Sequence, residues 1–264
     1  MSNKLSKLTV VKIGGATFDS HDTTIEDIVG LQQRGKLLVV VHGGANLVTE
    51  WLTRQGTATR FVHGERVTDE AALEMVTAVL GGLVNKEIVA TINSLGGKAV
   101  GICGADGALI QGRIRETEMG YVGAAVKVDL ALLTALLESG YIPVVAPLCL
   151  HSFDRLEGAP RLLNINGDTV AGEIAAAIGA ERLIFLTDVA GICDHSGKLL
   201  LQLSPGEVEA LMTSGVAAGG MIPKIKACMR ALDNTSTAHI IDGRQPHALL
   251  REIERGGGGT TIGK

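Results

Sequence analysis

The stretch TVVKIGGATF, residues 9–18, runs from β-branched residues directly into two glycines, and LVVVHGGAN, residues 38–46, repeats the same plan. Lys12 stands near the first glycine pair and His42 immediately before the second. Glycine has no Cβ, so it admits positive φ and lets another group come close to the backbone. Two such turns at strand ends predict a place where the main chain itself contacts a ligand.

Composition narrows the class of protein. A chain of 264 residues with 46% apolar content can bury the core of one large α/β domain or of two fused lobes. Its net charge of −4, with no Lys/Arg-rich run, argues against a nucleic-acid or anionic-membrane partner. We find no apolar stretch near the length of a membrane span and no signal-peptide pattern, so we expect a soluble, cytoplasmic protein with small-molecule partners.

The four cysteines are far apart and show no metal-ligand or redox spacing; they are Cys103, Cys149, Cys193 and Cys228. We interpret them as reduced thiols, and we expect no protein-bound metal site.

Short β-branched runs alternate with helical patterns, which predicts a mostly parallel sheet covered by helices. The expected strands are 8–13, 37–41, 142–148, 183–187 and 237–241, and the expected helices are 22–34, 46–55, 69–95, 168–178, 205–213 and 222–232. Residues 99–115 and 119–129 are expected to form a small antiparallel extension. The glycine-rich end, 256–264, is either a tail or the lead into a last short strand.

The long helical segment 69–95 carries apolar residues at steps of three and four: Leu73, Val76, Leu80, Leu83, Val84, Ile88 and Ile92. This stripe needs a partner surface, which is either the sheet of this chain or a second subunit. No Pro/Ser-rich linker marks a domain boundary, so two lobes that divide near residues 160–175 would share one continuous sheet.

The usual glycine-rich phosphate motifs are absent. No Gly-Lys pair is followed by Ser or Thr, as a P-loop requires, and neither IGGATF nor HGGANL supplies the GxGxxG of a dinucleotide site. The sequence instead has glycine pairs and basic residues in several segments that are far apart along the chain. Unpaired amides at the start of a helix bind anions, so this set is consistent with a different kind of phosphate site.

Six motifs together resemble the amino acid kinase family, and within it the acetylglutamate kinases. They are KIGG (12–15), HGGA (42–45), HGERVTD (63–69), NINGD (164–168), LTDVAGI (186–192) and GGMIPK (219–224). The likeness runs from about residue 9 to 262, and GxRVTD and GGMxPK are its specific parts.

The resemblance implies a three-layer αβα sandwich with a mostly parallel open sheet, as one amino acid kinase domain. It implies a lobe of about residues 1–165 for the amino-acid substrate and a lobe of about 166–264 for ATP, with Mg²⁺ held mainly by the nucleotide phosphates. The implied reaction moves the γ-phosphoryl group to the side-chain carboxylate of N-acetyl-L-glutamate, the second step of arginine biosynthesis. A carboxylate nucleophile is already ionised, so no general base is needed, and the barrier is electrostatic.

Three residues are carried over as catalytic. Lys12 and Lys224 would stabilise the phosphoryl group in flight, and Asp168 would hold the two ammonium groups in place. Lys12 also stands out without the resemblance, because a cation inside an apolar strand is costly unless it is paired. Asp168 is equally suited to cap the helix that follows it.

The resemblance also assigns the substrate contacts. Arg66 would clamp the α-carboxylate, Asn164 would read the amide or the α-carboxylate, and the amides of Gly43 and Gly44 would hold the reacting group. The nucleotide would contact Gly14, Gly15, Asp188, Gly191, Ala217, Gly219 and Met221. Two residues depart from the family pattern in this phosphate-binding region. Ala45 stands where the family commonly has a third glycine, and the Cβ of Ala45 is unfavourable if φ is positive there. Gly167 stands where alanine is usual. His42 is as well suited to a structural role as to a ligand contact.

Two alternatives share most of these features. One is a carrier-protein-linked aminoadipate or glutamate kinase of lysine biosynthesis, which HGERVTD fits less well. The other is a non-catalytic metabolite sensor of the same fold, which would be expected to lack Lys12, Asp168 or Lys224. We expect a homodimer through the helix 69–95, and the short segment before the first strand argues against the ring-forming helix of arginine-inhibited members.

Overall fold

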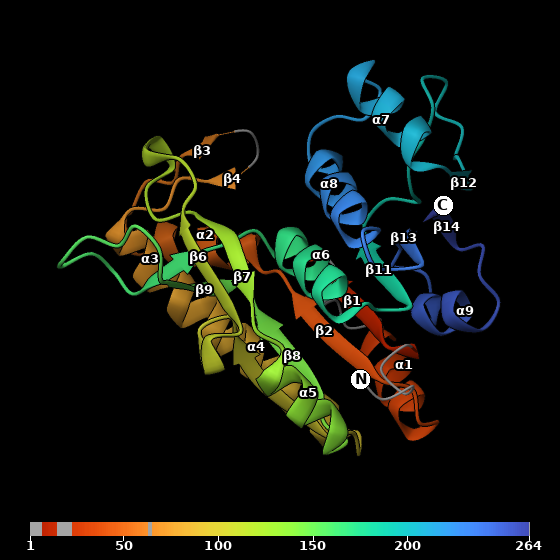
Figure 1. Ribbon diagram of the computed structural model, residues 1–264, viewed down its shortest axis with the longest axis horizontal. Coiled ribbons are helices and arrows are strands. Elements are labelled where there is room, and N and C mark those ends of the chain that lie inside the picture. Colours follow the sequence, from red (N-terminus) through yellow and green to blue (C-terminus); the bar gives the residue numbers. More distant parts are fainter. Residues whose placement is uncertain (1–6, 15–22, 63–64, 264) are drawn as a thin grey trace.

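A computed structural model describes residues 7–14, 23–62 and 65–263 of the chain. Its main sheet has eight strands in the order β12-β14-β13-β11-β1-β2-β8-β5 (Figure 1). Their bounds are β1 Thr9–Ile13, β2 Leu38–His42, β5 Ala99–Cys103, β8 Ile142–Ala146, β11 Arg182–Thr187, β12 Gln202–Leu203, β13 Thr237–Asp242 and β14 Gly259–Gly263. Every neighbouring pair is parallel except β13 and β14. The predicted mostly parallel sheet is confirmed.

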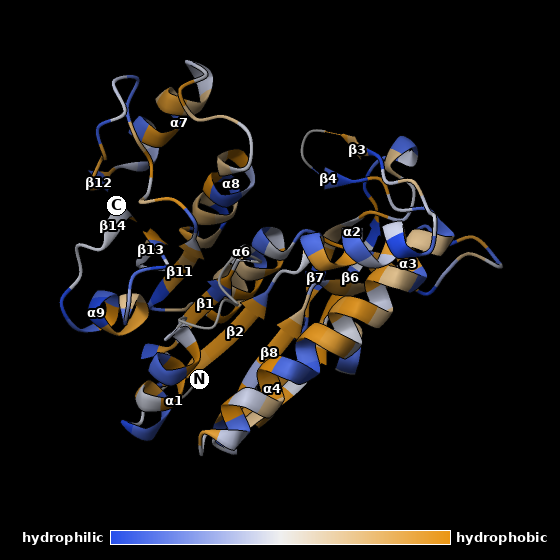
Figure 2. Ribbon diagram, turned by 180° about the vertical axis from the view of Figure 1, so that it is seen from behind, coloured by the Kyte–Doolittle hydropathy of each residue, from blue (hydrophilic) through white to orange (hydrophobic). Residues whose placement is uncertain are grey.

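Helices cover both faces of this sheet, which makes three layers. The α-helices of the described residues are α1 Thr24–Gln33, α2 Ala45–Arg54, α3 Glu70–Val76, α4 Asn85–Ser94, α5 Ala131–Glu138, α6 Gly167–Ile178, α7 Pro205–Thr213, α8 Met221–Ala231 and α9 Ala248–Glu254. Of these, α2 and α3 pack against each other beside Leu148 of the second sheet. Figure 1 looks onto the face under α5, α6 and α8, and Figure 2 onto the face under α1 and α4. The predicted αβα sandwich is therefore confirmed.

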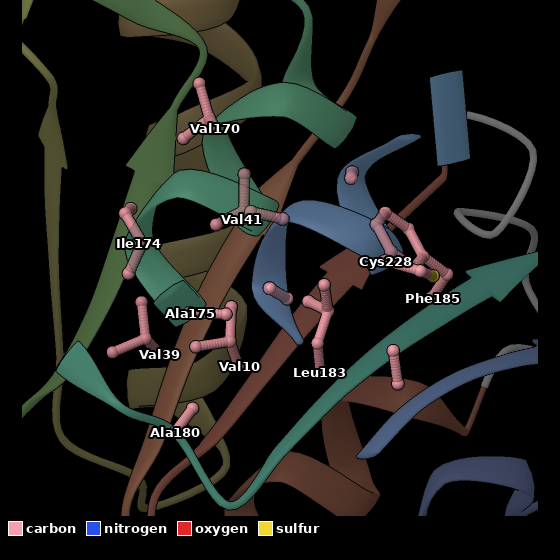
Figure 3. Close-up of a cluster of buried hydrophobic side chains, with 14 of the residues drawn as sticks. Val10, Val39, Val41, Val170, Ile174, Ala175, Ala180, Leu183, Phe185 and Cys228 are labelled. Carbon is pink, nitrogen blue, oxygen red and sulfur yellow. The ribbon is translucent and has the colours of Figure 1, made fainter. Parts of the chain in front are cut away.

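The β-branched runs are continuous because the strands are buried on both faces. Val10, Val39 and Val41 belong to the cluster under α5, α6 and α8, whereas Val11 and Val40 belong to the cluster under α1, α4 and α9. Figure 3 shows side chains of α6 over the first of these clusters, and the strands in Figure 2 are mostly hydrophobic. A charged side chain on such a strand has to find its partner inside the fold.

A second, four-stranded sheet has the order β10-β9-β6-β7. Its strands are β6 Ile110–Ile114, β7 Gly123–Val128, β9 Leu148–His151 and β10 Leu162–Asn164, and a short hairpin joins β3 Phe61–Val62 to β4 Glu65–Arg66. Two predictions are corrected here. The strand expected at 142–148 ends at Ala146, because Pro147 separates β8 from β9 in the other sheet. The antiparallel extension expected from 99–115 and 119–129 is confirmed for β6 and β7, but β5 belongs to the main sheet, where it pairs with β8, and β9 pairs with β6 in parallel.

The long helical segment is one continuous helix of 25 residues, Glu70–Ser94. Its middle part, η2 Thr77–Val84, is π-helical, and Asp69 caps its start by accepting from the Ala72 N–H at 2.8 Å. The wider π turn shifts the apolar stripe, so that Leu83, expected inside, is 46% exposed.

The expectation that no apolar stretch reaches the length of a membrane span is wrong for this helix by length and composition. An 18-residue window has a mean hydropathy of 1.4. However, Leu73, Val76 and Leu80 are buried beside α2, and Ile88 and Ile92 are buried against the sheet. The helix Glu70–Ser94 therefore packs its apolar side against the core of this fold.

The remaining predicted elements lie within one or two residues of the observed ones, and the glycine-rich end leads into β14. Beyond the proposed division near residues 160–175, β11 pairs with β1, so the sheet is continuous across it. The helices α5 and α9 were not anticipated.

Candidate active site

The site lies where parallel strands end. The carboxyl ends of β1, β2, β8 and β11 meet at one edge of the sheet, followed by Gly14, Gly43, Pro147 and Asp188. These four residues line a cavity of about 330 Å³. Ligands of open α/β sheets bind in such a crevice, and Gly14 of the first glycine pair and both glycines of the second line it.

A cluster of three charged side chains forms the floor of this cavity. Asp168 Oδ1 lies 2.7 Å from Lys12 Nζ, and Asp168 Oδ2 lies 3.1 Å from Lys224 Nζ. Lys12 is 8% exposed and Asp168 is 5% exposed. The structure thus brings together two lysines from opposite ends of the sequence, with one carboxylate between them.

The ionisation of Asp168 depends on this pairing. Burial acts to raise the pKa of the Asp168 carboxyl, but the charges and hydrogen bonds of Lys12 and Lys224 outweigh burial, and the pKa is lowered overall. Lys224 also donates to the Gly220 carbonyl at 3.3 Å. Asp168 is therefore an ionised carboxylate between the two lysine side chains at neutral pH.

The start of α6 positions Asp168. Asn166 is the N-cap, and its Oδ1 accepts from the Asp168 N–H at 2.7 Å. The capping role considered for Asp168 therefore belongs to Asn166, which leaves the Asp168 carboxylate free to bind the lysines. Gly167 fits closely here, since a Cβ would lie 3.2 Å from the His42 carbonyl oxygen and 3.6 Å from Lys12 Cε.

The Gly43–Gly44 turn contributes one free amide, not two. The Gly43 N–H donates to the Ile13 carbonyl at 3.1 Å, so the expected ligand contact through that amide is corrected. Among the described residues, none accepts from the Gly44 N–H. Gly44 has φ +141°, and a Cβ there would lie 2.7 Å from Leu80 Cδ2. Ala45 begins α2 in helical conformation, so its Cβ is compatible with the turn.

His42 is a fully buried structural histidine behind this turn. Its Nδ1 lies 2.8 Å from the Gly43 carbonyl oxygen, and its Nε2 lies 3.2 Å from Asn85 Nδ2. Burial, assisted by the charges of Lys12 and Lys86, lowers the pKa of His42 to about 4. The ring is therefore neutral over the whole physiological range.

Arg66 carries an unsatisfied cationic donor. It is 7% exposed and lines the cavity, and its Nη2 donates to the Ala45 carbonyl at 3.0 Å and to Thr49 Oγ1 at 2.6 Å. The Phe61 ring centroid lies 4.8 Å from its Cζ. Its Nη1 is buried and finds no acceptor in the described part of the chain. A guanidinium that is fixed in position and has an N–H without an acceptor can bind a carboxylate.

The rest of the lining is mixed. Asn164 donates through Nδ2 to Thr68 Oγ1 at 2.9 Å. The apolar part of the lining includes Val48, Val76, Leu80 and Val122. We did not anticipate Glu65 or Asn166, both of which line the cavity. Their signal was present, since they lie inside the HGERVTD and NINGD motifs.

The residues expected around the nucleotide divide into two groups. Gly14 and Asp188 line the cavity, whereas Gly191, Ala217, Gly219 and Met221 do not. Gly191 has φ +148°, and a Cβ there would lie 2.6 Å from Thr260 Oγ1, so packing against β14 already requires glycine. Ala217 is buried in the core and Met221 begins α8. Gly15 lies outside the described residues.

The fold and this cluster of cations, together with the Gly44 N–H, define an αβα protein with a cavity at the edge of its sheet that suits an anionic small molecule. The family model for the amino acid kinase family matches residues 7–242. The chain belongs to the amino acid kinase family.

Its curated relatives match it over most of their own length. It is 50% identical over 262 residues to the acetylglutamate kinase of Dehalococcoides mccartyi (strain CBDB1), covering 99% of this chain and 96% of that one. It is 48% identical over 252 residues to the acetylglutamate kinase of Thermosynechococcus vestitus, covering 92% and 83%. Among solved structures, N-acetylglutamate synthase from Neisseria gonorrhoeae, complexed with coenzyme A and N-acetyl-glutamate, matches with a TM-score of 0.83 at 28% identity, covering 98% of this chain and 60% of that one.

Proposed function

We propose that this protein is an ATP-dependent kinase that phosphorylates the side-chain carboxylate of N-acetyl-L-glutamate, the second step of arginine biosynthesis. The carrying observation is the Lys12–Asp168–Lys224 cluster on the floor of the cavity. The curated relatives that match nearly the whole chain are named acetylglutamate kinase, which supports the choice of substrate.

The chemistry suits this cluster because the nucleophile needs no base. A γ-carboxylate is ionised at neutral pH and needs no base. The activation barrier therefore comes from the repulsion between this anion and the polyphosphate, and from the negative charge on the oxygens of the transferring group. Lys12 and Lys224 supply the compensating charge. Asp168 holds both ammonium groups in place before the substrates arrive, so little reorganisation is needed during the reaction.

Arg66 recognises the α-carboxylate in this proposal. Its buried Nη1 lacks an acceptor among the described residues, and a substrate carboxylate would provide one. Asn164 reads the amide or the same carboxylate, and the Gly44 N–H holds the reacting group.

ATP is placed toward the C-terminal lobe, about residues 166–264, and the amino-acid substrate toward the N-terminal lobe, about 1–165. Gly14 and Asp188 are near the phosphates, and Ala217, Gly219 and Met221, next to the start of α8, frame the adenine. In this proposal the nucleotide phosphates carry the Mg²⁺ ion. When bound, Mg²⁺ neutralises charge on the β- and γ-phosphates.

We also propose a cytoplasmic homodimer that forms through the helix 69–95. The exposed Leu83 on η2 supports this proposal, since an apolar side chain on the outer face of that helix lacks cover from its own chain.

The test is a hydroxamate assay for acyl phosphate with Mg·ATP and N-acetyl-L-glutamate, free glutamate or N-acetyl-aminoadipate. We expect product with N-acetyl-L-glutamate alone. Product with only the aminoadipate derivative would favour a lysine-pathway kinase. Nucleotide binding without product from any of the three would favour a sensor. Either result would overturn the proposal.

A further inference from the structure

The peptide between Gly43 and Gly44 has to be held in one orientation if the Gly44 N–H is to contact the transferring phosphoryl group. Neither flanking residue has a Cβ, so the peptide can turn over at low conformational cost. In one orientation the Gly44 N–H is available to the cavity that Gly44 lines, and in the other the Gly43 carbonyl takes its place. An oxygen at that position would repel a phosphate.

The surroundings of His42 determine which ring nitrogen carries the proton. Asn85 Nδ2 donates to the Val144 carbonyl at 2.9 Å, and Asn85 Oδ1 accepts from Lys86 Nζ at 3.0 Å. The amide is therefore oriented with its NH₂ group toward His42 Nε2, 3.2 Å away. An NH₂ group can only donate, so Nε2 is the acceptor of the neutral ring and Nδ1 bears the hydrogen.

This tautomer fixes the peptide. Nδ1–H donates to the Gly43 carbonyl at 2.8 Å, which holds that oxygen on the His42 side. The carbonyl and the following N–H of a trans peptide point in opposite directions, so the Gly44 N–H points away from His42. In the strand register Lys12 pairs with Val41, whose side chain lies under α6, whereas His42 packs toward Asn85 of α4. The free N–H is thus turned away from the face of His42, toward the face of Lys12 and Asp168.

We propose that His42 is a positioning residue, which Asn85 and Lys86 hold in one tautomer so that it locks the Gly43–Gly44 peptide with the Gly44 N–H toward the transferring phosphoryl group. This inference rests on the proposed kinase reaction for its kinetic effect, but not for its structural one. His42 itself touches no substrate and exchanges no proton.

The kinetic test compares two substitutions of His42. His42→Leu removes the donor and should lower kcat by roughly 10²-fold, the usual result of a misplaced catalytic group, with KM for N-acetyl-L-glutamate changed less than about threefold. In His42→Asn the side-chain NH₂ group can replace Nδ1–H, and kcat should return to within about fivefold of the wild type. Equal losses in both variants, or a loss expressed only in KM, would overturn the proposal.

His151→Leu is the matched control. His151 is also buried, with Nδ1 3.0 Å from the Pro160 carbonyl oxygen, but it lies outside the cavity. Its substitution removes the same kind of bond and should leave kcat unchanged. If kcat falls as far as in His42→Leu, the effect is a general result of losing a buried histidine, and the proposal fails.

A spectroscopic test needs no turnover and no substituted protein. In wild type labelled with ¹⁵N at histidine and glycine, His42 should show a protonated Nδ1 and an unprotonated Nε2, and adding Mg·AMP-PNP should shift the Gly44 amide resonance. The opposite tautomer, or a Gly44 resonance that does not respond, would refute the lock. If the wild type forms no acyl phosphate while both spectroscopic results hold, the proposed reaction fails and the lock stands.

Discussion

Replacing Asp168 by Asn should be the most informative single change, because one carboxylate separates two buried ammonium groups. The substitution keeps the shape and removes the charge, leaving Lys12 and Lys224 to repel each other in a poorly hydrated site. Removing one partner of a buried ion pair costs about 3–5 kcal/mol. The lower value applies here, because Lys224 is partly exposed and water relieves it.

The expected change in thermal stability follows from the chain length. An unfolding entropy of about 2.1 cal/mol/K per residue gives about 0.55 kcal/mol/K for this chain, so a loss of ~3 kcal/mol lowers Tm by about 5 °C. Scanning calorimetry measures the shift. Asp188→Asn is the control, since the Asp188 carboxylate lies in the same cavity but is exposed. Its Tm should change by less than about 1 °C.

Nucleotide should restore the lost stability, because the triphosphate brings anionic charge to the two lysines. The rise in Tm on adding saturating Mg·ATP should be larger for Asp168→Asn than for the wild type. At the same time kcat should fall by roughly 10²-fold, because the lysines are no longer held in place. A variant with wild-type Tm, or one that nucleotide stabilises less than the wild type, would refute this account of Asp168.

The interaction of Asp168 with the two lysines also makes the free energy of unfolding depend on pH. The lysines lower the pKa of the folded Asp168 carboxyl despite its burial, so its contribution is complete above the unfolded pKa of about 3.9 and is lost as pH falls through the folded value. The difference in unfolding free energy between wild type and Asp168→Asn should be constant from about pH 8 to 5 and shrink below about pH 4. Urea unfolding at several pH values measures it, and a difference that grows on acidification would contradict the sign.

Three further changes test other parts of the site. Lys224→Met should lower kcat by about 10²–10³-fold in the acyl-phosphate assay, whereas Lys226→Met, an exposed position on the same helix, should not. Arg66→Lys loses the planar fork and should raise KM for N-acetyl-L-glutamate by about tenfold or more with a smaller effect on kcat, as initial-rate kinetics would show. Gly44→Ala places a Cβ 2.7 Å from Leu80 Cδ2 at φ +141°, and calorimetry should show a loss of about 2 kcal/mol.

Much of the architecture could be predicted because the strands are buried on both faces and therefore read as uninterrupted β-branched runs. The failure at residues 142–148 has a specific cause. IPVVAPLCL, residues 142–150, is apolar throughout; Pro143 lies inside β8, and Pro147 marks where the chain leaves one sheet for the other. A single proline does not reveal which neighbours the next strand will find.

In the candidate site, too, some features could be predicted from the sequence and others could not. Lys12 could be selected from its sequence alone, since a cation in a buried strand requires a partner, and the structure supplies Asp168. The sequence could not predict which backbone N–H groups are already hydrogen-bonded within the fold, or which glycines are required by packing. The Gly43 N–H is taken by Ile13 of the neighbouring strand, and Gly191 is required by Thr260 of β14. Both facts depend on contacts between segments distant in sequence.

The strand order has a consequence for how the chain is made. Within the described strands β12 pairs only with β14, which is synthesised after β13 and has to enter between them. Until β14 emerges from the ribosome, β13 presents an open edge that can pair with another nascent chain. Closing that edge therefore has to wait for β14, and a ribosome that stalls before β14 leaves an aggregation-prone product.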